Sequence, residues 1–455
     1  MTKLIETVYN FLWGDLFTIH ISDFKIGIPL LVLLLIPTGI FFTIRTRFMP
    51  IRKFPQMVKA LTDKNNDKSS LSTFQTLIVS TATRVGMGNL VGVVAAVSVG
   101  GAGAVFWMWI SAFLGASTAY AEGTLAQLHK KKDPLYGGYH GGPAYYIHDF
   151  VEEKRKKKIK KSFLAILFAF FGLICWCGIS QVISNSVSSA FNNAFHIPPI
   201  YTTVVLVILA AIIVLRKNAT VKFLDIIVPV MAVAYFAVTI FIMVKNYKLI
   251  PSVFTRIFEE AFGIKQIAGG GFGAVLMNGI KRGLFSNEAG SGSAPCAAAA
   301  AEGKKPETIG MVQALGVLID TIVICTCTAM IILLVPQEMT DSLQGMELLQ
   351  TAMNYHLGPA GTYFIAIILF LFSFSTFLGI LFYARSNVAY ICGNNWQSQT
   401  IYKIIALIML FIGGLQAYTV VWDLGDVGIG LMTIINIIVL IPMSKKAIDL
   451  LDKKE

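Results

Sequence analysis

The chain has 455 residues, of which 55% are hydrophobic and 14% are charged, and its mean hydropathy is +0.70. Soluble domains carry about 25% charged residues, so this composition excludes an ordinary soluble fold and indicates a protein immersed in lipid. The net charge of +12 does not indicate nucleic acid, because the basic residues gather in short segments between apolar stretches. We expect the bilayer and a small molecule as partners, with no nucleic acid, organic cofactor or obligate protein partner.

Apolar stretches of about 20 residues recur from one end of the chain to the other. A helix of that length rises ~30 Å, the thickness of the hydrocarbon core of a bilayer. We therefore expect an all-α polytopic protein of the cytoplasmic membrane with about eleven transmembrane helices. The expected spans are residues 26–44, 74–97, 104–126, 163–190, 199–215, 223–244, 266–284, 307–335, 358–383, 400–418 and 425–443.

The basic residues alternate across the loops between these spans. Most of the 37 Lys and Arg residues fall in every second loop, and the loops 191–198, 336–357 and 419–424 contain none. Because basic loops mark the cytoplasmic side, the pattern predicts the N-terminus outside and the C-terminus inside. Within the outer loops, Asp341–Met353 has apolar residues at helical spacing, which indicates either a lid or a plain interfacial helix.

Glycines and polar residues interrupt two of the spans. The second contains Gly86, Gly88 and Asn89 beside Arg84, and the seventh contains a glycine run at 269–271 followed by Asn278 and Gly279. Bare backbone at membrane depth is tolerated only where protein or a water-filled cavity satisfies it. Small residues also let helices pack closely, but two clusters at equivalent places favour two broken helices.

The two interrupted spans fall at matching places in the chain. Without the first span, ten remain, and two sets of five run in opposite senses with the interrupted helix first in each. This is the arrangement of inverted-repeat transporters. The expected organisation is an N-terminal outer segment, extra helix and loop (1–73), two five-helix repeats (74–245 and 246–443) and a cytoplasmic tail (444–455).

A broken helix offers complementary groups to a zwitterion and a cation. The free N–H groups of one half-helix attract a carboxylate, and the free C=O groups of the other can coordinate Na⁺. An amino acid bound together with a sodium ion satisfies both ends and leaves little net charge buried.

Three runs of residues resemble the sodium:alanine (alanine or glycine:cation) symporter family, and the likeness extends over nearly the whole chain. They are Val-Gly-Met-Gly-Asn-Leu-Val-Gly-Val at 85–93, Gly-Ala-Val-Phe-Trp-Met-Trp at 103–109, and the long run from Asn278 to Pro295. The resemblance implies a leucine-transporter-like fold with a 5+5 inverted repeat. It also implies a transporter rather than an enzyme, one that couples Na⁺ to the uptake of a small neutral amino acid.

The resemblance also implies roles for particular residues. For sodium, it points to the backbone oxygens of Ala82 and Val85 and the hydroxyls of Ser375 and Thr376. For the amino acid, it points to the two broken helices and to residues facing them. The residues implied in substrate binding are Gly86, Met87, Gly88, Asn89, Gln181, Ile183, Asn278, Gly279 and Thr376.

Two departures from the family pattern bear on the substrate. Met87 stands where the family usually has Thr, and Ile183 stands at the first position of a Gln-x-Asn pattern, with Gln181 two residues earlier. Met is flexible and polarisable and shapes adaptable sites, so alanine, glycine, serine and glutamine all stay open as substrates.

Several charged residues lie within or beside the spans. A charge at the bilayer centre costs ~3 kcal/mol or more and usually finds a partner, so Arg84 and Asp320 are expected to pair, either in gating or in structure. Lys281, Arg282 and Glu288 are expected to form an inner gate network. Glu122, near the inner end of its span, is expected to reach the interface.

The sequence thus predicts a sodium-coupled symporter that imports a small neutral amino acid by alternating access. A proton-coupled carrier is the alternative, disfavoured because no buried carboxylate is evident at a break. A channel would need a continuous polar pore and an enzyme a nucleophile with its base, and the sequence shows neither.

Overall fold

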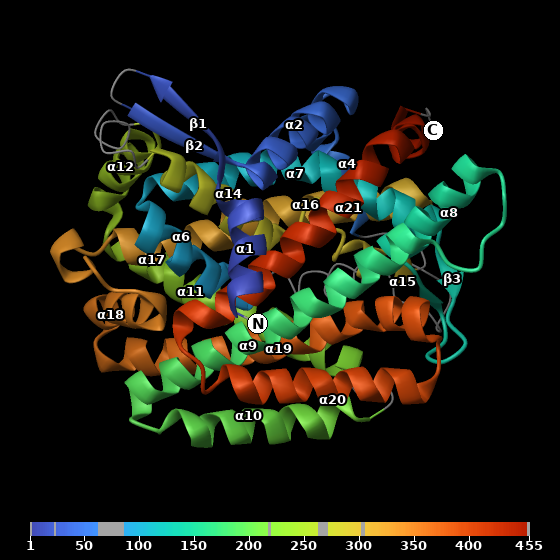
Figure 1. Cartoon of the computed structure of the whole chain (residues 1–455). Coiled ribbons are helices and arrows are strands. Elements are labelled where there is room, and N and C mark those ends of the chain that lie inside the picture. The colour runs from blue at the N-terminus through green and yellow to red at the C-terminus, as the bar shows by residue number, and fades with distance from the viewer. Residues whose placement is uncertain are drawn as a thin grey trace.

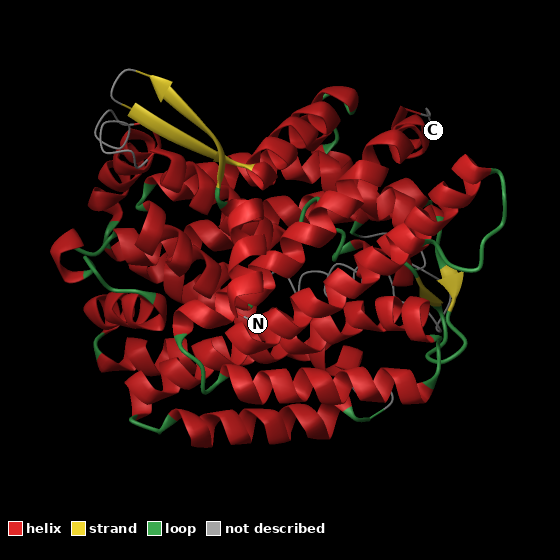
Figure 2. Ribbon diagram, viewed as in Figure 1, coloured by secondary structure: helices red, strands yellow, loops and turns green. Residues whose placement is uncertain are grey.

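The structure is a computed structural model that describes residues 2–21, 24–61, 86–216, 220–262, 272–301 and 305–452. Helices make up nearly all of the described chain, with two short β-hairpins at its edges (Figure 2). The all-helical prediction is therefore confirmed apart from these hairpins.

Every expected span overlaps helical structure. The elements are α2 (Leu30–Arg45), η1 (Gly88–Gly92) with α6 (Val93–Gly100), α7 (Gly103–Leu128), α9 (Phe163–Phe195), α10 (Pro199–Val214), α11 (Thr220–Lys245), α14 (Phe272–Asn287), α16 (Pro306–Leu318) with η3 (Ile319–Cys325) and α17 (Thr326–Leu333), α19 (Pro359–Cys392), α20 (Trp396–Gly413) and α21 (Tyr418–Asp452).

Shorter elements connect these helices. They are α1 (Thr2–Trp13), β1 (Asp15–Ile21), β2 (Phe24–Pro29), α3 (Met49–Arg52), α4 (Phe54–Ala60), β3 (Lys131–Lys132), β4 (Tyr139–His140), α8 (Pro143–Arg155), η2 (Tyr247–Leu249), α12 (Ile250–Phe262), α15 (Pro295–Ala300), η4 (Gln337–Met339) and α18 (Gly345–Leu357).

Among the described residues, seven helices are long and apolar enough to cross a membrane, and α2, α10 and Gly88–Gly100 are shorter apolar helices. The chain is thus a multi-pass membrane protein. In Figure 1, α12 and α18 lie at one side of the molecule and α8 and β3 at the opposite side. The alternation of basic and non-basic loops predicts this grouping, because α12 and α18 fall in loops expected outside and α8 and β3 in a loop expected inside. The count of eleven crossings, the repeat and the orientation stay predictions.

Helix α9 is the central packing element, with α19, α20 and α21 along its length (Figure 1). Close approach depends on small residues, as is usual between helices in lipid. Gly178 of α9 touches the backbone of α21, where a Cβ on Gly178 would lie 2.3 Å from the amide nitrogen of Gly425. The two helices therefore meet backbone to backbone at this point.

The N-terminal region differs from the expectation. Strands β1 and β2 pair antiparallel, from Asp15 opposite Pro29 to Ile21 opposite Phe24. The first apolar helix therefore starts at Leu30 rather than at residue 26, directly after Pro29. At the other end, α21 continues to Asp452, so most of the expected tail is helical.

The expected amphipathic helix of the loop 336–357 is present as α18, four residues later than its apolar pattern indicates. Its apolar face is buried, including Met346, Leu349 and Met353. Gln350 donates to the carbonyl oxygen of Ala190 in α9 at 2.9 Å and accepts from the Asn193 amide at 3.0 Å. The helix therefore packs on protein.

Gly178→Ala tests the contact between α9 and α21. The added methyl group would overlap the backbone of Gly425, so we expect a loss of about 1–3 kcal/mol in stability and a lower melting temperature in detergent. Gly425→Ala is the matched control, because its Cβ would meet its nearest atom at an ordinary 3.7 Å. Equal melting temperatures for the two variants would contradict this packing.

Candidate functional site

The described part of the first interrupted helix begins at Gly86. A turn leads into η1, a π-helical turn over Gly88–Gly92, a geometry that is frequent at functional sites. Ala82, Arg84 and Val85 lie outside the described residues. The expected Arg84–Asp320 pair and the two backbone sodium ligands therefore stay predictions.

Asn89 lies at the centre of this region and is fully buried. Its Oδ1 accepts a hydrogen bond from the Gly86 amide at 3.0 Å, which satisfies a backbone donor at the start of the helix. Its Nδ2 donates to Asp320 Oδ1 at 2.8 Å and to Ser286 Oγ at 3.3 Å. One side chain thus joins the first interrupted helix to α14 and η3.

Asp320 is also fully buried and lies in η3, a second π-helical stretch. Its Oδ2 accepts from Ser286 Oγ at 2.7 Å and from Thr321 Oγ1 at 3.0 Å. Ser286 was not among the residues expected at the site, although it falls within the long run that carries the family resemblance. Asp320 therefore holds two helices at the centre of the molecule.

The two hydroxyl residues expected at sodium lie on α19 against the same segment. Thr376 Oγ1 accepts from the Met87 amide at 3.0 Å and donates to the Phe372 carbonyl at 2.8 Å. Ser375 donates to the same carbonyl at 2.9 Å, and both hydroxyl residues are buried. Hydroxyl and carbonyl oxygens are ligands that suit a hard cation.

The expected interruption of the seventh span at Asn278 and Gly279 is wrong. Helix α14 is continuous through both residues. A Cβ on Gly279 would lie 2.5 Å from the Ala104 carbonyl oxygen and from Trp107 Cβ, so this glycine serves close packing against α7. The Asn278 amide donates within its own helix, to the Ala274 carbonyl at 2.9 Å.

The described chain does leave helical geometry after Asn287, whereas the expected interruption at the glycine run 269–271 lies outside the described residues. The backbone adopts positive φ at Glu288 (58°), Gly290 (88°) and Gly292 (84°), and α15 begins at Pro295. Glycine takes such angles without a steric penalty, and proline suits a helix start. The signal was present in the sequence, in the run Gly-Ser-Gly-Ser-Ala-Pro at 290–295.

Lys281 and Arg282 pair with an aspartate that sequence analysis did not single out. Lys281 Nζ lies 3.1 Å from Asp426 Oδ2, and Arg282 donates to both carboxylate oxygens of Asp426 at 3.2 and 3.1 Å. Asp426 is near the start of α21, beside the loop expected outside. The acidic partner of Lys281 and Arg282 is thus Asp426 rather than Glu288, and the expected inner gate network of Lys281, Arg282 and Glu288 stays a prediction. Glu288 lies buried at the break.

Aromatic rings separate this charged cluster from Asn89. The Arg282 guanidinium lies 3.9 Å from the ring centroid of Trp422, and Trp422 lies 4.9 Å from Phe285. A Cβ on Gly88 would lie within 3.6 Å of the Phe285 ring. The path from the charged cluster to the interrupted helix is thus filled by these side chains.

Gln181 and Ile183 of α9 do not share one face, because residues two apart on a helix point to different faces. Gln181 packs on α20, with its Nε2 3.3 Å from the Met409 sulfur. Ile183 is fully buried in the apolar core. The described contacts of Gln181 do not join it to the group around Asn89.

Glu122 is buried rather than interfacial, with 1% of its surface exposed. Its Oε2 accepts from the Gly290 amide at 2.9 Å, within the break that follows α14. A buried carboxylate does therefore lie at a break, contrary to the expectation from the sequence.

A polar hollow of about 370 Å³ lies between α9, α18 and the start of α21. Asn185, Asn193 and Glu347 line it, and Tyr418 lies at its edge next to Trp422. The hollow is on the side expected to face outward. The ring of Tyr418 lies 6.3 Å from that of Trp422, centroid to centroid.

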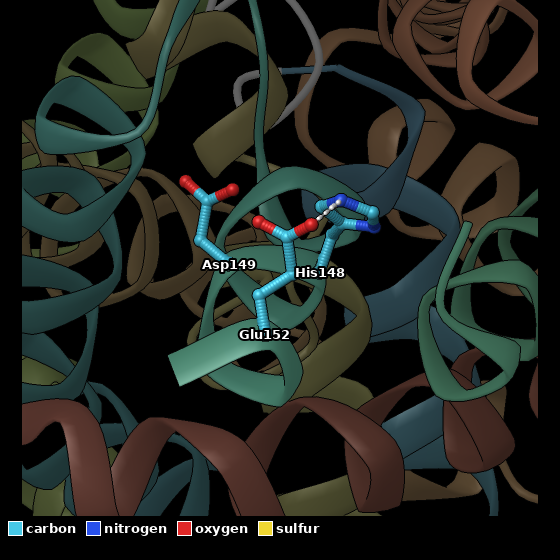
Figure 3. Close-up of side chains that lie close together, drawn as sticks. All are labelled: His148, Asp149 and Glu152. Atoms are coloured by element: carbon cyan, nitrogen blue, oxygen red, sulfur yellow. Dashed lines mark ion pairs between the residues drawn. The ribbon is translucent and has the colours of Figure 1, made fainter. Parts of the chain in front are cut away.

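Within the described ranges, one group of three side chains could hold a metal ion: His148, Asp149 and Glu152 of α8 (Figure 3). Asp149 already binds His129 at 2.6 Å, and Glu152 accepts from the Ile159 amide at 2.8 Å. Burial acts to raise the pKa of Asp149, but the hydrogen bond and charge of His129 outweigh it and lower the pKa. The group is therefore explained as an ion-paired surface cluster.

Asp426→Asn tests the charged cluster. It would leave two buried cations without their acidic partner, which typically costs about 3–5 kcal/mol, so we expect a clearly lower melting temperature. Asp423→Asn is the matched control, since Asp423 lies one turn earlier on α21 and forms no ion pair with any described residue. A melting temperature for Asp426→Asn as high as that of the control would contradict the pairing.

Comparison with known proteins identifies relatives along nearly the whole chain. The model of the sodium:alanine symporter family matches residues 15–454. The amino-acid carrier protein AlsT of Bacillus subtilis is 38% identical, over 98% of this chain and 90% of its own. The probable sodium/glutamine symporter GlnT of the same organism is 39% identical, over 91% and 86%.

The sodium/alanine symporter AgcS of Methanococcus maripaludis is 36% identical, over 97% of this chain and 94% of its own. Among solved structures, a manganese transporter variant of Eremococcus coleocola covers 85% of this chain and 81% of its own, at 12% identity and a TM-score of 0.49. The sequence matches decide the family: the chain belongs to the sodium:alanine symporter family, a family of amino-acid symporters and not of enzymes.

Proposed function

We propose that this protein is a sodium-coupled symporter that imports a small neutral amino acid across the cytoplasmic membrane by alternating access. The observation that carries the proposal is the buried polar group around Asn89. It joins an interrupted helix to a hydroxyl pair on α19 and to Ser286 and Asp320. Buried polar residues at membrane depth generally mark ion and substrate pathways.

In this proposal, the segment Gly86–Asn89 receives the substrate carboxylate on its backbone N–H groups. The Met87 amide now bonds to Thr376 Oγ1, and a bound carboxylate would compete for such donors. Sodium binds between Ser375, Thr376 and the backbone oxygens of Ala82 and Val85. The cation and the carboxylate then offset one another, so little net charge is buried.

Gating belongs to the charged residues at the outer side. Arg282 and Lys281, held by Asp426, close the path above Trp422 and Phe285. The cation–π contact and the bidentate pair must both separate before an amino acid can pass from the polar hollow to Asn89. The predicted pair of Arg84 and Asp320 is the second gating element of this proposal.

Energetics allow a single sodium ion. One charge moving down ~100 mV yields about 2.3 kcal/mol, and a tenfold sodium gradient adds about 1.4 kcal/mol. Together these support accumulation of the amino acid by roughly several hundred-fold. One coupling ion is therefore sufficient.

Substrate choice depends on the side chains around the first interruption. The named relatives include a sodium/alanine symporter and a probable sodium/glutamine symporter. Met87 is buried where the family usually has Thr, and its flexible thioether suits more than one side-chain size. Alanine, glycine, serine and glutamine are the substrates to compare first.

A proton-coupled carrier is the second candidate, and one observation favours it. Glu122 is buried at the second break, and a buried carboxylate is the group that a transported proton requires. A relative from Bacillus strain PS3, 33% identical over 86% of this chain, is called a sodium/proton-dependent alanine carrier protein. Sodium and proton coupling therefore have to be separated by experiment.

The test is uptake of a panel of labelled amino acids into proteoliposomes. We expect accumulation only with an inward sodium gradient. Thr376→Val removes a proposed sodium ligand at nearly constant volume, so the sodium concentration for half-maximal uptake should rise roughly tenfold. The matched control is Thr239→Val, since Thr239 is buried in α11 and bonds only within that helix.

Two results would overturn the proposal. Equal accumulation under a choline-balanced proton gradient would move the assignment to proton coupling. An unchanged sodium dependence in Thr376→Val would remove α19 from the sodium site.

A further inference from the structure

We propose that Glu122 and Asn436 are positioning residues that hold the second helix break, and through it set Ser286 beside Asn89. This inference rests on the proposed transport function for its meaning, but its geometry can be tested separately. Neither residue belongs to the sites expected from the sequence.

Both backbone polar groups of Gly290 are held by side chains from other helices. The Gly290 amide donates to Glu122 Oε2 of α7 at 2.9 Å. The Gly290 carbonyl accepts from Asn436 Nδ2 of α21 at 3.0 Å. Gly290 has φ +88°, so no regular helix supplies partners for these groups.

Asn436 also holds the carboxylate of Glu122 in place. Its Nδ2 donates to Glu122 Oε1 at 2.6 Å, and its Oδ1 accepts a hydrogen bond from the hydroxyl of Tyr146 in α8. The carboxylate of Glu122 thus uses one oxygen for Gly290 and the other for Asn436. Helices α7 and α21 thus both bond to Gly290, and α8 supports them through the bond from Tyr146 to Asn436.

Burial explains why a charge matters here. Glu122, Asn436 and Tyr146 are all buried, with at most 1% of each exposed. Taking a carboxylate out of water costs several kcal/mol unless hydrogen bonds compensate, and bonds to a charged group are about twice as strong as neutral ones. Burying a neutral side chain would cost less free energy. The carboxylate of Glu122 therefore indicates that two strong hydrogen-bond acceptors are needed here, one for the Gly290 amide and one for Asn436 Nδ2.

Hydrogen bonds along the break link the position of Gly290 to that of Ser286 near Asn89. Gly290 is four residues beyond Ser286, and the residues between them are tied as well: the Ala289 amide donates to Asn287 Oδ1, and Asn287 Nδ2 donates to Thr321. Ser286 in turn bonds to Asn89 and Asp320. Moving Gly290 would therefore move Ser286 relative to the proposed substrate site.

Glu122→Gln is the central variant. Glutamine has one acceptor oxygen where the carboxylate has two, so it can serve either Gly290 or Asn436, and its amide opposes the other donor. Positioning errors of about 1 Å can cost a hundredfold in rate, so we expect the maximal uptake rate per folded transporter to fall roughly 10- to 100-fold. The substrate concentration for half-maximal uptake should change much less, by a factor of about three or below.

The double variant Glu122→Gln/Asn436→Asp reverses the polarity of the pair. Glutamine can then accept from Gly290 and donate to the new aspartate, which still accepts from Tyr146. The Gly290 carbonyl loses its donor and instead faces an aspartate oxygen, so the recovery is expected to be partial. We expect the double variant to recover at least about half of the lost rate on a logarithmic scale, a coupling that independent sites would not show.

Thr433→Val is the matched control, because Thr433 is buried on α21 one turn before Asn436 and bonds only to the Ile429 carbonyl. Its transport rate should stay within about twofold of the unaltered protein. Folded protein is counted in every variant by size-exclusion profile and melting temperature.

Hydrogen–deuterium exchange at Gly290 separates this proposal from the proposed function, since it needs no transport. Glu122→Gln should speed exchange of the Gly290 amide at least tenfold, and the double variant should slow it again. Unchanged exchange, or a rate for folded Glu122→Gln within twofold of the unaltered protein, would overturn the positioning role. Failure of the unaltered protein to transport any amino acid, with the expected exchange pattern intact, would instead overturn the proposed function alone.

Discussion

One constraint governs this protein: a backbone N–H or C=O group cannot be left bare in lipid. Two of its helices are nevertheless interrupted or distorted in the core of the molecule. The freed groups therefore have to be given to side chains of other helices. Asn89 and Thr376 accept from the amides of Gly86 and Met87, and Glu122 accepts from the amide of Gly290.

These side chains join the two interrupted helices into one unit. Asn89 reaches Asp320 and Ser286, and Ser286 is four residues from Gly290. In the proposed account, a change at either break reaches the other through these hydrogen bonds. That linkage is what a carrier needs if sodium and an amino acid are to bind and leave together.

The cluster of Arg282, Asp426 and Trp422 next to this unit is held by an ion pair and a cation–π contact instead. Arg282 is held by two bonds to Asp426 and lies over the ring of Trp422. In the proposed mechanism, electrostatics and aromatic packing close the side expected to face outward, while hydrogen bonds to the backbone shape the centre. The polar hollow beside Tyr418 lies just beyond the closure.

The sequence predicted the helices well, because an apolar stretch of about 20 residues has few solutions in lipid. It also singled out Asn89, since a polar residue among glycines at membrane depth has few purposes, whereas Thr376 was implied by the family resemblance. The first strand pair was missed because the end of β2, residues 26–29, runs directly into the apolar helix α2 and was counted with it.

The second break was placed wrongly for a clear reason. Glycines serve both as breaks and as packing surfaces, and at Gly279 the deciding neighbours are Ala104 and Trp107, which are far away in the sequence. Asp426 was missed in the same way, because its partner Arg282 lies 144 residues earlier in the chain. Such pairs become visible only when the helices are placed next to one another.

The central claim is that the interrupted helices bind an amino acid and a sodium ion as one coupled pair. Equilibrium binding to the purified protein tests it most directly, with a labelled amino acid titrated at several sodium concentrations and sodium titrated at several amino-acid concentrations. We predict that each ligand raises the affinity of the other by the same factor, roughly tenfold or more. Affinities that do not depend on the second ligand would contradict the account.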